Sequence, residues 1–135
     1  MLYLGTETNN MKKVISTKNA PAAIGPYSQA ILSNNTLYCS GQIAINPATG
    51  DLVMENITAE TTQVMQNILA VLTAADMDFS NVVKCSIFMK DMNDYAAINE
   101  VYAEFFGENP PAREAVQVSA LPKNVNVEIS VIAVK

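Results

Sequence analysis

The sequence predicts an α+β domain in which a six-stranded mixed β-sheet carries two helices on one face. Two stretches have apolar residues at helical spacing, and six others read as strands, in the order β-β-β-α-β-α-β-β. The chain has 135 residues, which fits one domain able to bury a core without metal or disulfide support. We expect a single domain over residues 11–135 and a loose extension over residues 1–10, which are polar and lack periodicity.

Three strands are expected before the first helix. A short strand is predicted over residues 13–16, and Ile24-Gly25-Pro26-Tyr27 separates it from a second strand over residues 28–32. The pair Asn34-Asn35 can form a turn with positive φ angles. The second strand and residues 36–45 are therefore predicted to form a β-hairpin.

Both helices are predicted from apolar periodicity. Residues 59–75 form the first, with Asn56 or Thr58 as its N-cap. The residues expected on its polar side are Glu60, Gln63, Gln66 and Asn67. Residues 93–106 form the second, which Gly107 and the following prolines end. Its apolar stripe consists of Tyr95, Ile98, Tyr102 and Phe105.

The other three strands are predicted after the first helix. Residues 82–90 alternate in polarity, and the residues expected to face the core are Val83, Cys85, Ile87 and Met89. Residues 112–120 and 125–134 are predicted to form a hairpin around a turn at residues 121–124. Pairing across that turn sets Gln117 opposite Glu128 and places Arg113 and Glu128 on the same sheet face, the one without helices.

The helix-free face predicts a homo-oligomer, because an apolar patch of roughly several hundred Å² left in water is an aggregation hazard. The residues on it that are too small and apolar for a solvated surface are Ala115, Ser119, Ser130 and Ile132. Arg113 and Glu128 are separated by roughly 13 Å along a strand, which is too far for a simple ion pair. Each is either a surface or interface charge with a structural partner, or the two meet across a subunit contact and form a pocket.

Composition excludes several kinds of chemistry. The chain has no histidine, which excludes Ser-His-Asp and Cys-His catalysis and histidine-ligated zinc. A net charge of −5 argues against nucleic acid as a partner. Arg113 is the single arginine, so it alone can grip a carboxylate at two points.

Cysteine usage and the apolar runs suggest a compartment. Cys39 and Cys85 lie in apolar, strand-like runs without metal or redox spacing, so both are expected to be reduced core thiols. The longest apolar run covers only residues 68–72, and we see no secretory signal. A soluble, cytoplasmic protein is expected.

Several ordered motifs resemble the reactive-intermediate deaminase family, also called RidA or YjgF, over residues 11–135. They are Ala23-Ile24-Gly25-Pro26-Tyr27-Ser28-Gln29-Ala30, Ser40-Gly41-Gln42-Ile43, Pro111-Ala112-Arg113, Leu121-Pro122-Lys123 and Val127-Glu128-Ile129. The resemblance implies a chorismate-mutase-like fold and a homotrimer with its sites between subunits. It also implies hydrolysis of 2-imino acids and their enamine tautomers, such as 2-aminoacrylate and 2-iminopropionate, to 2-keto acids and ammonia, without metal or organic cofactor.

The resemblance also implies roles for individual residues. Arg113 matches the clamp for the substrate carboxylate, and Glu128 matches the residue that holds and activates the attacking water. The residues implied to line the substrate pocket are Tyr27, Ser40, Gly41 and Asn99. Tyr27 can equally be a half-buried aromatic at a strand end, and Asn99 an exposed helix residue.

This sequence departs from the family at Ala115, a position in the implied substrate pocket where many members have cysteine. A thiol nucleophile is therefore absent there, and we expect the change to alter pocket packing and redox sensitivity while sparing hydrolysis. The alternative function is a non-catalytic trimer that binds a small carboxylate such as a 2-keto acid, or that is chaperone-like. Chorismate mutase chemistry needs more cations than one arginine, and the missing histidine and acidic balance disfavour a ribonuclease.

Overall fold

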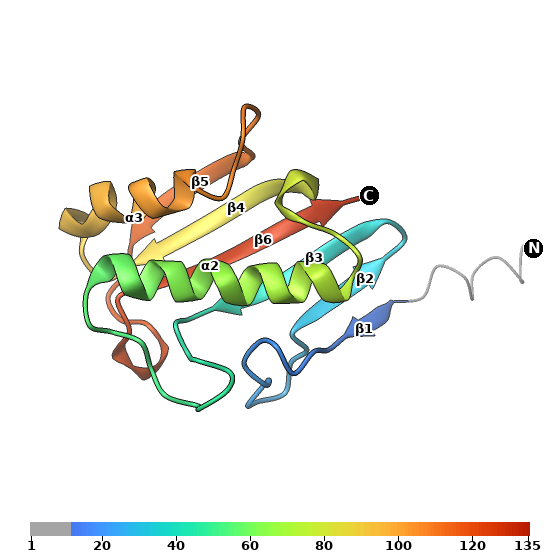
Figure 1. Cartoon of the computed structure of the whole chain (residues 1–135), viewed down its shortest axis with the longest axis horizontal. Helices are drawn as coiled ribbons and strands as arrows, with labels where there is room; N and C mark the ends of the chain where they lie inside the picture. Colours follow the sequence, from blue (N-terminus) through green and yellow to red (C-terminus); the bar gives the residue numbers. More distant parts are fainter. Residues whose placement is uncertain (1–11) are drawn as a thin grey trace, which may run out of the picture.

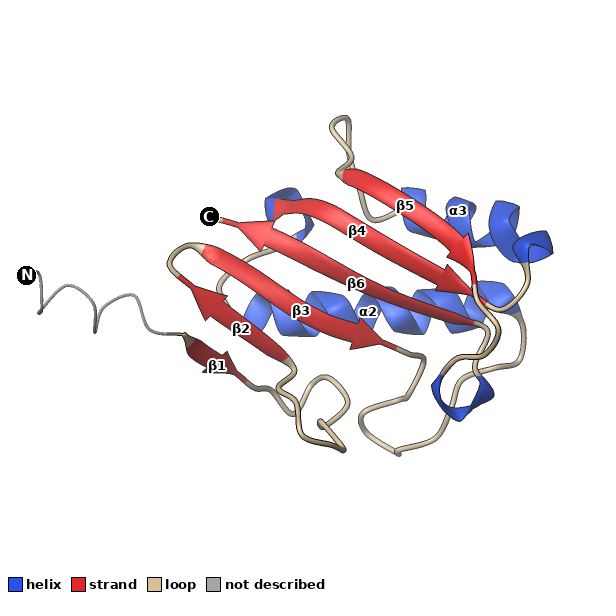
Figure 2. Cartoon of the chain, turned by 180° about the vertical axis from the view of Figure 1, so that it is seen from behind, coloured by secondary structure: helices blue, strands red, loops and turns tan. Residues whose placement is uncertain are grey.

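The computed structural model describes residues 12–135, so the extension expected over residues 1–10 lies outside the described residues. Within that range one six-stranded sheet carries two α-helices on one face, as Figures 1 and 2 show from opposite sides. The strands and the two α-helices follow the predicted order. Their bounds are β1 Lys13–Ile15, β2 Ala30–Ser33, β3 Thr36–Gln42, α2 Ile57–Ala74, β4 Val82–Met89, α3 Tyr95–Ala103, β5 Ala112–Gln117 and β6 Val127–Val134.

The sheet order is β1-β2-β3-β6-β4-β5, which corrects the predicted C-terminal hairpin. Strand β6 is antiparallel to both β3 and β4, and β5 lies at the edge, parallel to β4. Residues 118–126 are too long for a tight hairpin turn and contain the 3₁₀ turn η3 (Pro122–Asn124). At the end of β4, Val118 N–H donates to the Met89 carbonyl, and Lys90 N–H donates to the Asn126 carbonyl. The end of β4 therefore binds the segment that follows β5 and the segment that precedes β6.

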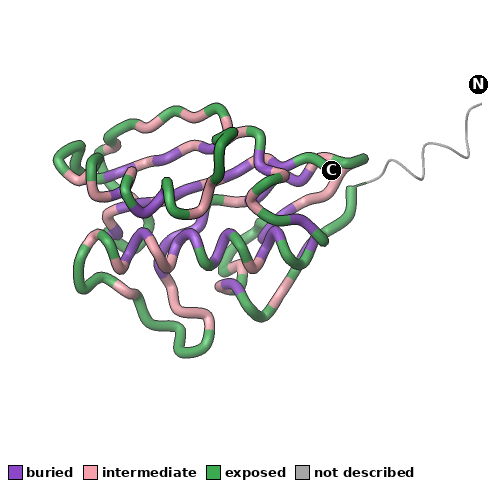
Figure 3. Tube along the Cα trace, turned by 45° about the horizontal axis from the view of Figure 1, so that its top comes forward, coloured by how far each residue is buried: buried purple, intermediate pink, exposed green. Residues whose placement is uncertain are grey.

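Helix α2 begins where its cap predicts and buries its apolar face on the sheet. The Asn56 side chain accepts a hydrogen bond from Ala59 N–H, which confirms one of the two expected caps. Figure 3 shows buried positions recurring along α2 and along the central strands β4 and β6. The fully buried side chains that α2 contributes to the core include Val64, Met65, Ile68, Val71 and Leu72.

Two polar residues of α2 are buried, contrary to the prediction that they face water. Glu60 is 0% exposed, and its carboxylate accepts hydrogen bonds from Asn126 N–H and Nδ2 at 2.8 Å each. Asn67 Nδ2 donates to the carbonyls of Ile43 and Ile45. These loop groups lack strand partners, so buried side chains satisfy them, a need that helical periodicity cannot reveal.

Strand β4 is irregular at its start. The register shifts between Val82 and Lys84, which turns Val83 outward, so the prediction that Val83 faces the core is wrong. Cys85, Ile87 and Met89 face the core as expected. Both Cys39 and Cys85 are free and buried, in agreement with the sequence.

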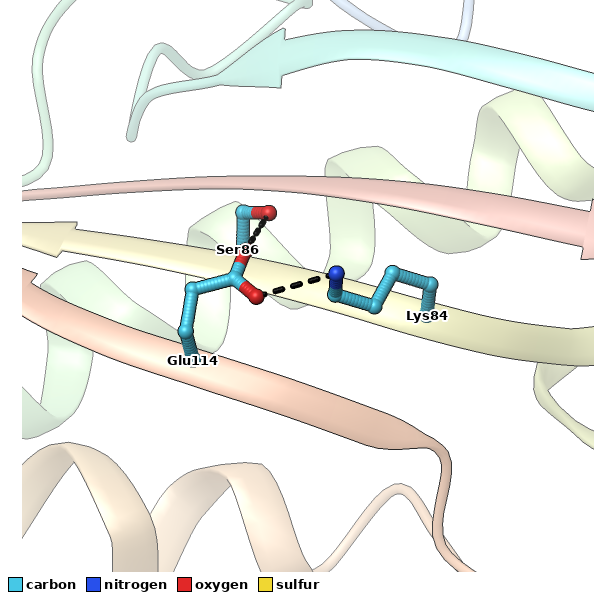
Figure 4. Close-up of polar contacts among 3 residues, drawn as sticks. All are labelled: Lys84, Ser86 and Glu114. Carbon is cyan, nitrogen blue, oxygen red and sulfur yellow. Dashed lines mark hydrogen bonds and ion pairs between the residues drawn. The ribbon is translucent and has the colours of Figure 1, made fainter.

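The helix-free face, seen in Figure 2, carries large apolar side chains that remain exposed. Tyr38 is 51% exposed and Val116 41%, and Ile132 lies beside Tyr38 in the β3–β6 register. A small polar cluster interrupts this surface (Figure 4), where Glu114 pairs with Lys84 at 3.0 Å and accepts a hydrogen bond from the Ser86 hydroxyl. No helix among the described residues is long and apolar enough to cross a membrane.

Candidate active site

Glu128 lies on the helix-free face of β6, because its neighbours Val127 and Ile129 are buried in the core. Its carboxyl is half-buried, and this burial raises the pKa of Glu128 above its ordinary value. A raised pKa makes a carboxyl a better proton acceptor than an ordinary one, as a group that takes a proton from water must be. The prediction that Glu128 lies on the helix-free face of the sheet is confirmed.

Gly41 gives Glu128 its space. The β3–β6 register shifts between Cys39 and Gln42, which makes a bulge at Ser40 and Gly41. A Cβ atom built on Gly41 would lie 2.8 Å from Glu128 Cδ, closer than any ordinary contact. Only glycine therefore allows the Glu128 carboxylate to lie against the strand here.

A cavity of about 110 Å³ brings Tyr27, Gly41 and Glu128 together. The other side chains that line it are largely apolar. They are Pro21, Ala22, Ile24, Gln29, Gln42, Ile43, Ile45, Pro122 and Lys123. Tyr27 lies in the loop before β2 and is 52% exposed, so its alternative interpretation as a half-buried aromatic stays open. We call this cavity the acidic half-site.

The loop that forms one wall of the acidic half-site is fixed by Gln29. Its buried side chain donates to the carbonyls of Thr17, Ala20 and Pro21 and accepts from Thr17 N–H at 2.7 Å. Ser40 is also a structural residue in this chain: its hydroxyl donates to the Ser28 carbonyl at 2.6 Å, and it does not line the cavity.

Arg113 lies elsewhere, and its predicted placement on the helix-free face is wrong. In the parallel β4–β5 register Arg113 pairs with the core residue Cys85, so its side chain points toward α3. Arg113 Nη1 donates to Asn99 Oδ1 at 2.7 Å, and Nη2 donates to Tyr95 Oη at 2.9 Å. The guanidinium carbon is 4.9 Å from the centre of the Tyr102 ring. The wrong prediction followed from pairing β5 with β6.

Arg113 borders a groove of about 360 Å³. The other residues that line it come from α3 and the loop after it: Asn99, Tyr102, Ala103, Phe106, Gly107 and Pro110. The groove thus combines one permanent cation with an amide and an apolar wall. We call it the basic half-site, and Asn99 is one of the residues that line it.

Ala115 does not line either half-site. It pairs with Ile87 in the β4–β5 register and packs against the core, so its predicted place on the helix-free face is wrong. Ser119, also expected there, lies in a bend beyond the end of β5. Neither cysteine replaces the missing thiol, since burial raises the pKa of Cys85 and raises that of Cys39 to about 12.

The two half-sites are chemically complementary and separate. Within residues 12–135 they share no lining residue, and they lie on opposite sides of the sheet. In the same part of the chain, no three His, Cys, Asp or Glu side chains gather in a group able to hold a metal ion.

Sequence reasoning did not assign Tyr95 or Tyr102 to a site, because both fit the apolar stripe of α3. The spacing of Tyr95, Asn99 and Tyr102 was the available signal, since positions i, i+4 and i+7 share one helix face.

Comparison with known proteins shows the family to which the chain belongs. A family model described as Endoribonuclease L-PSP matches residues 17–135. A RutC family protein of Pyrococcus horikoshii is 55% identical over 125 residues, which cover 93% of this chain and 99% of that protein. A 2-iminobutanoate/2-iminopropanoate deaminase of Capra hircus is 50% identical, with coverage of 93% and 91%.

Two solved structures share the fold over nearly their whole length. A Yersinia pestis protein of the conserved Rid family is 54% identical with a TM-score of 0.90, covering 93% of this chain and 100% of that one. E. coli TdcF, solved with bound serine, is 39% identical with a TM-score of 0.88, covering 91% and 98%.

Proposed function

This chain belongs to the endoribonuclease L-PSP family, which is the RidA/YjgF family that its sequence motifs resemble, and we propose that it is a hydrolytic deaminase. Its substrates are reactive 2-imino acids and their enamine tautomers, and its products are 2-keto acids and ammonia. The support is the set of relatives about 50% identical that are named 2-iminobutanoate/2-iminopropanoate deaminases. The two half-sites offer the groups that this reaction needs, namely the Arg113 guanidinium to bind the substrate carboxylate and the Glu128 carboxylate to activate water.

The active site in this proposal forms between subunits of a homotrimer, from the acidic half-site of one chain and the basic half-site of the next. The observation that carries the proposal is the separation of Glu128 from Arg113 in the single chain. The exposed apolar residues Tyr38, Val116 and Val134 of the helix-free face support the assembly, because such a face favours burial against another copy.

Arg113 holds the substrate by its carboxylate. A guanidinium has five N–H donors, and the Asn99 and Tyr95 bonds use one on each terminal nitrogen. Three donors remain, which is enough for a two-point bond to a carboxylate. Because the clamp engages a group common to all 2-imino acids, it fixes the reacting carbon without selecting the side chain.

Glu128 acts on the water. Its carboxylate accepts a proton from the water as the water oxygen adds to the protonated imine carbon, giving a neutral carbinolamine. Glu128 then returns the proton to the amino group, the carbon–nitrogen bond breaks and ammonia leaves. As it leaves, the hydroxyl oxygen becomes the carbonyl oxygen of the keto acid and gives its proton to the Glu128 carboxylate. The raised pKa of Glu128 suits a group that first accepts and then donates.

The second candidate is a non-catalytic protein that binds a small carboxylate. The E. coli TdcF structure with bound serine favours it, because serine carries a carboxylate next to a nitrogen-bearing carbon. Arg113 fits both functions. Glu128 favours catalysis, since a second negative charge beside an anionic ligand weakens binding unless that group handles protons or water.

The test generates an imine from L-alanine with an amino-acid oxidase and follows its loss with a trapping reagent. We expect the chain to shorten the lifetime of the imine at catalytic concentration while oxygen consumption by the oxidase stays constant. A lifetime unchanged by the protein, together with tight binding of the keto acid, would replace the deaminase by the binding protein. Light scattering on the same sample measures the oligomer, and a stable monomer would contradict the shared site.

A further inference from the structure

The surroundings of Arg113 point to a residue that tunes the clamp. Resting on the proposed function, we propose that Tyr95 is a positioning residue: its hydroxyl, with Asn99 one helical turn further on, fixes the rotation of the Arg113 guanidinium so that its free N–H groups face a ligand carboxylate.

Two acceptors hold the two terminal nitrogens separately. Tyr95 Oη accepts from Nη2 at 2.9 Å and Asn99 Oδ1 accepts from Nη1 at 2.7 Å. Residues four apart on a helix lie on the same face, so α3 presents the two acceptors side by side. With one acceptor the plane of the guanidinium can still turn, whereas two acceptors set its orientation.

Aromatic rings add a second constraint on the same group. The Arg113 guanidinium carbon lies 4.9 Å from the centre of the Tyr102 ring and 5.6 Å from that of Tyr95. Tyr102 is 5% exposed and is therefore held firmly by the core. A buried ring supports a guanidinium without using any of its N–H donors.

The chain also anchors Tyr95 to the strand that carries Arg113. The 3₁₀ turn η2 (Met92–Asp94) leads directly into Tyr95, and Met92 N–H donates to Gln117 Oε1 at 2.7 Å. Gln117 lies at the end of β5, four residues after Arg113. The first turn of α3 and the Arg113 side chain are thus fixed to one strand, so their separation is set by the fold.

The electrostatics of Tyr95 agree with an acceptor role. A hydrogen bond with Asn99 and the Arg113 charge lower the pKa of Tyr95 below its ordinary value. Both effects stabilise negative charge on the phenolic oxygen, which is the atom that accepts from Nη2.

The expected consequence is a change in substrate binding. Tyr95→Phe keeps the ring but removes the acceptor, so the guanidinium keeps Asn99 and its aromatic support and loses its fixed orientation. Carboxylate contacts are present both before and during the chemical step, so KM should rise while kcat stays near the wild-type value. A hydrogen bond to a charged group corresponds to a rise of roughly ten- to a hundredfold.

The experiment measures kcat and KM on an imine generated in situ, and the Kd of 2-oxobutanoate by calorimetry. The control is Thr62→Val, which removes an exposed hydroxyl that bonds only within α2, and it should leave both constants unchanged. When Arg113 is already replaced by lysine, Tyr95→Phe should not weaken 2-oxobutanoate binding any further, because the guanidinium that the Tyr95 hydroxyl orients is absent.

The outcomes separate this inference from the proposed function. If wild-type protein hydrolyses the imine and Tyr95→Phe binds 2-oxobutanoate as tightly as wild type, only the role of Tyr95 is overturned. An equal loss in the two backgrounds, or a fall in kcat at constant KM, would also overturn it. Absence of imine hydrolysis by the wild type contradicts the proposed function instead.

Discussion

Replacing Gly41 by alanine tests whether the position of Glu128 matters more than its presence. The new Cβ atom would lie 2.8 Å from Glu128 Cδ and 3.0 Å from both Cγ and Oε2. Ordinary carbon contacts are about 3.5–4.0 Å, so the carboxylate has to move by roughly 0.7–1.2 Å. It can do so because it borders a cavity, and the fold is therefore expected to survive.

The effect on activity follows from the size of that displacement. A catalytic group moved by about 1 Å loses on the order of a hundredfold in rate. Stability should change little, because alanine in a strand gains roughly 0.5–1 kcal/mol over glycine and this offsets part of the steric cost. We therefore expect Gly41→Ala to lose about a hundredfold in kcat/KM for imine hydrolysis with a nearly unchanged melting temperature.

Gly50→Ala is the matched control, because it should lower stability and leave activity unchanged, whereas Gly41→Ala should lower activity and leave stability nearly unchanged. Gly50 has φ +81°, and a Cβ there meets no atom within 4 Å. Alanine at that φ costs about 1 kcal/mol of folding free energy, while both half-sites are left intact. The reasoning fails if Gly41→Ala keeps full activity, or if its activity falls only in proportion to its loss of folded protein.

Three further predictions concern the two half-sites and the helix-free face. Arg113→Lys should abolish measurable imine hydrolysis in an intact oligomer, because an ammonium lacks the two-point geometry; near-normal turnover would remove the clamp assignment. Glu128→Gln should still bind 2-oxobutanoate but lose most of the rate. At pH 7 the variant should also melt at a higher temperature than the wild type. Because burial raises the pKa of Glu128 in the folded state, the wild type loses stability as the pH rises through that pKa, and the difference in melting temperature should vanish below about pH 4.3, the pKa of glutamate in an unfolded chain. Equal melting temperatures at all pH values would contradict the burial of this carboxyl. Val116→Glu should shift the assembly toward monomer in light scattering and reduce activity in parallel, whereas an active monomer would exclude a shared site.

Local patterns predicted the elements because each element depends on residues close together in the chain. The cap at Asn56, the alternation in β4 and the apolar spacing of α2 are all local signals, and the structure has the corresponding elements. The placement of Glu128 also followed, since its buried neighbours Val127 and Ile129 define its face whichever strand is adjacent.

Pairing between distant segments was not predictable in the same way. Arg113 was assigned to the wrong face because proximity in sequence favoured a hairpin, whereas the apolar alternation of β6 equally fits a central strand between β3 and β4. The roles of Glu60 and Asn67 depend on backbone groups in the loops at residues 43, 45 and 126, far away in the chain, to which their side chains are hydrogen-bonded. Such bonds leave no periodic trace in the sequence.

The corrected topology makes the case for a shared site stronger than the predicted hairpin did. Glu128 and Val116 both pair with Phe88, so β6 and β5 are two strand spacings apart, or roughly 10 Å. Arg113 is three residues from Val116, which adds roughly 10 Å along β5, and its side chain leaves the sheet on the opposite side from Glu128. A substrate with its carboxylate only one bond from the imine carbon cannot reach both groups of one chain. If both groups act on it, one of them has to come from another copy, and the exposed apolar face that bears Glu128 is where that copy would bind.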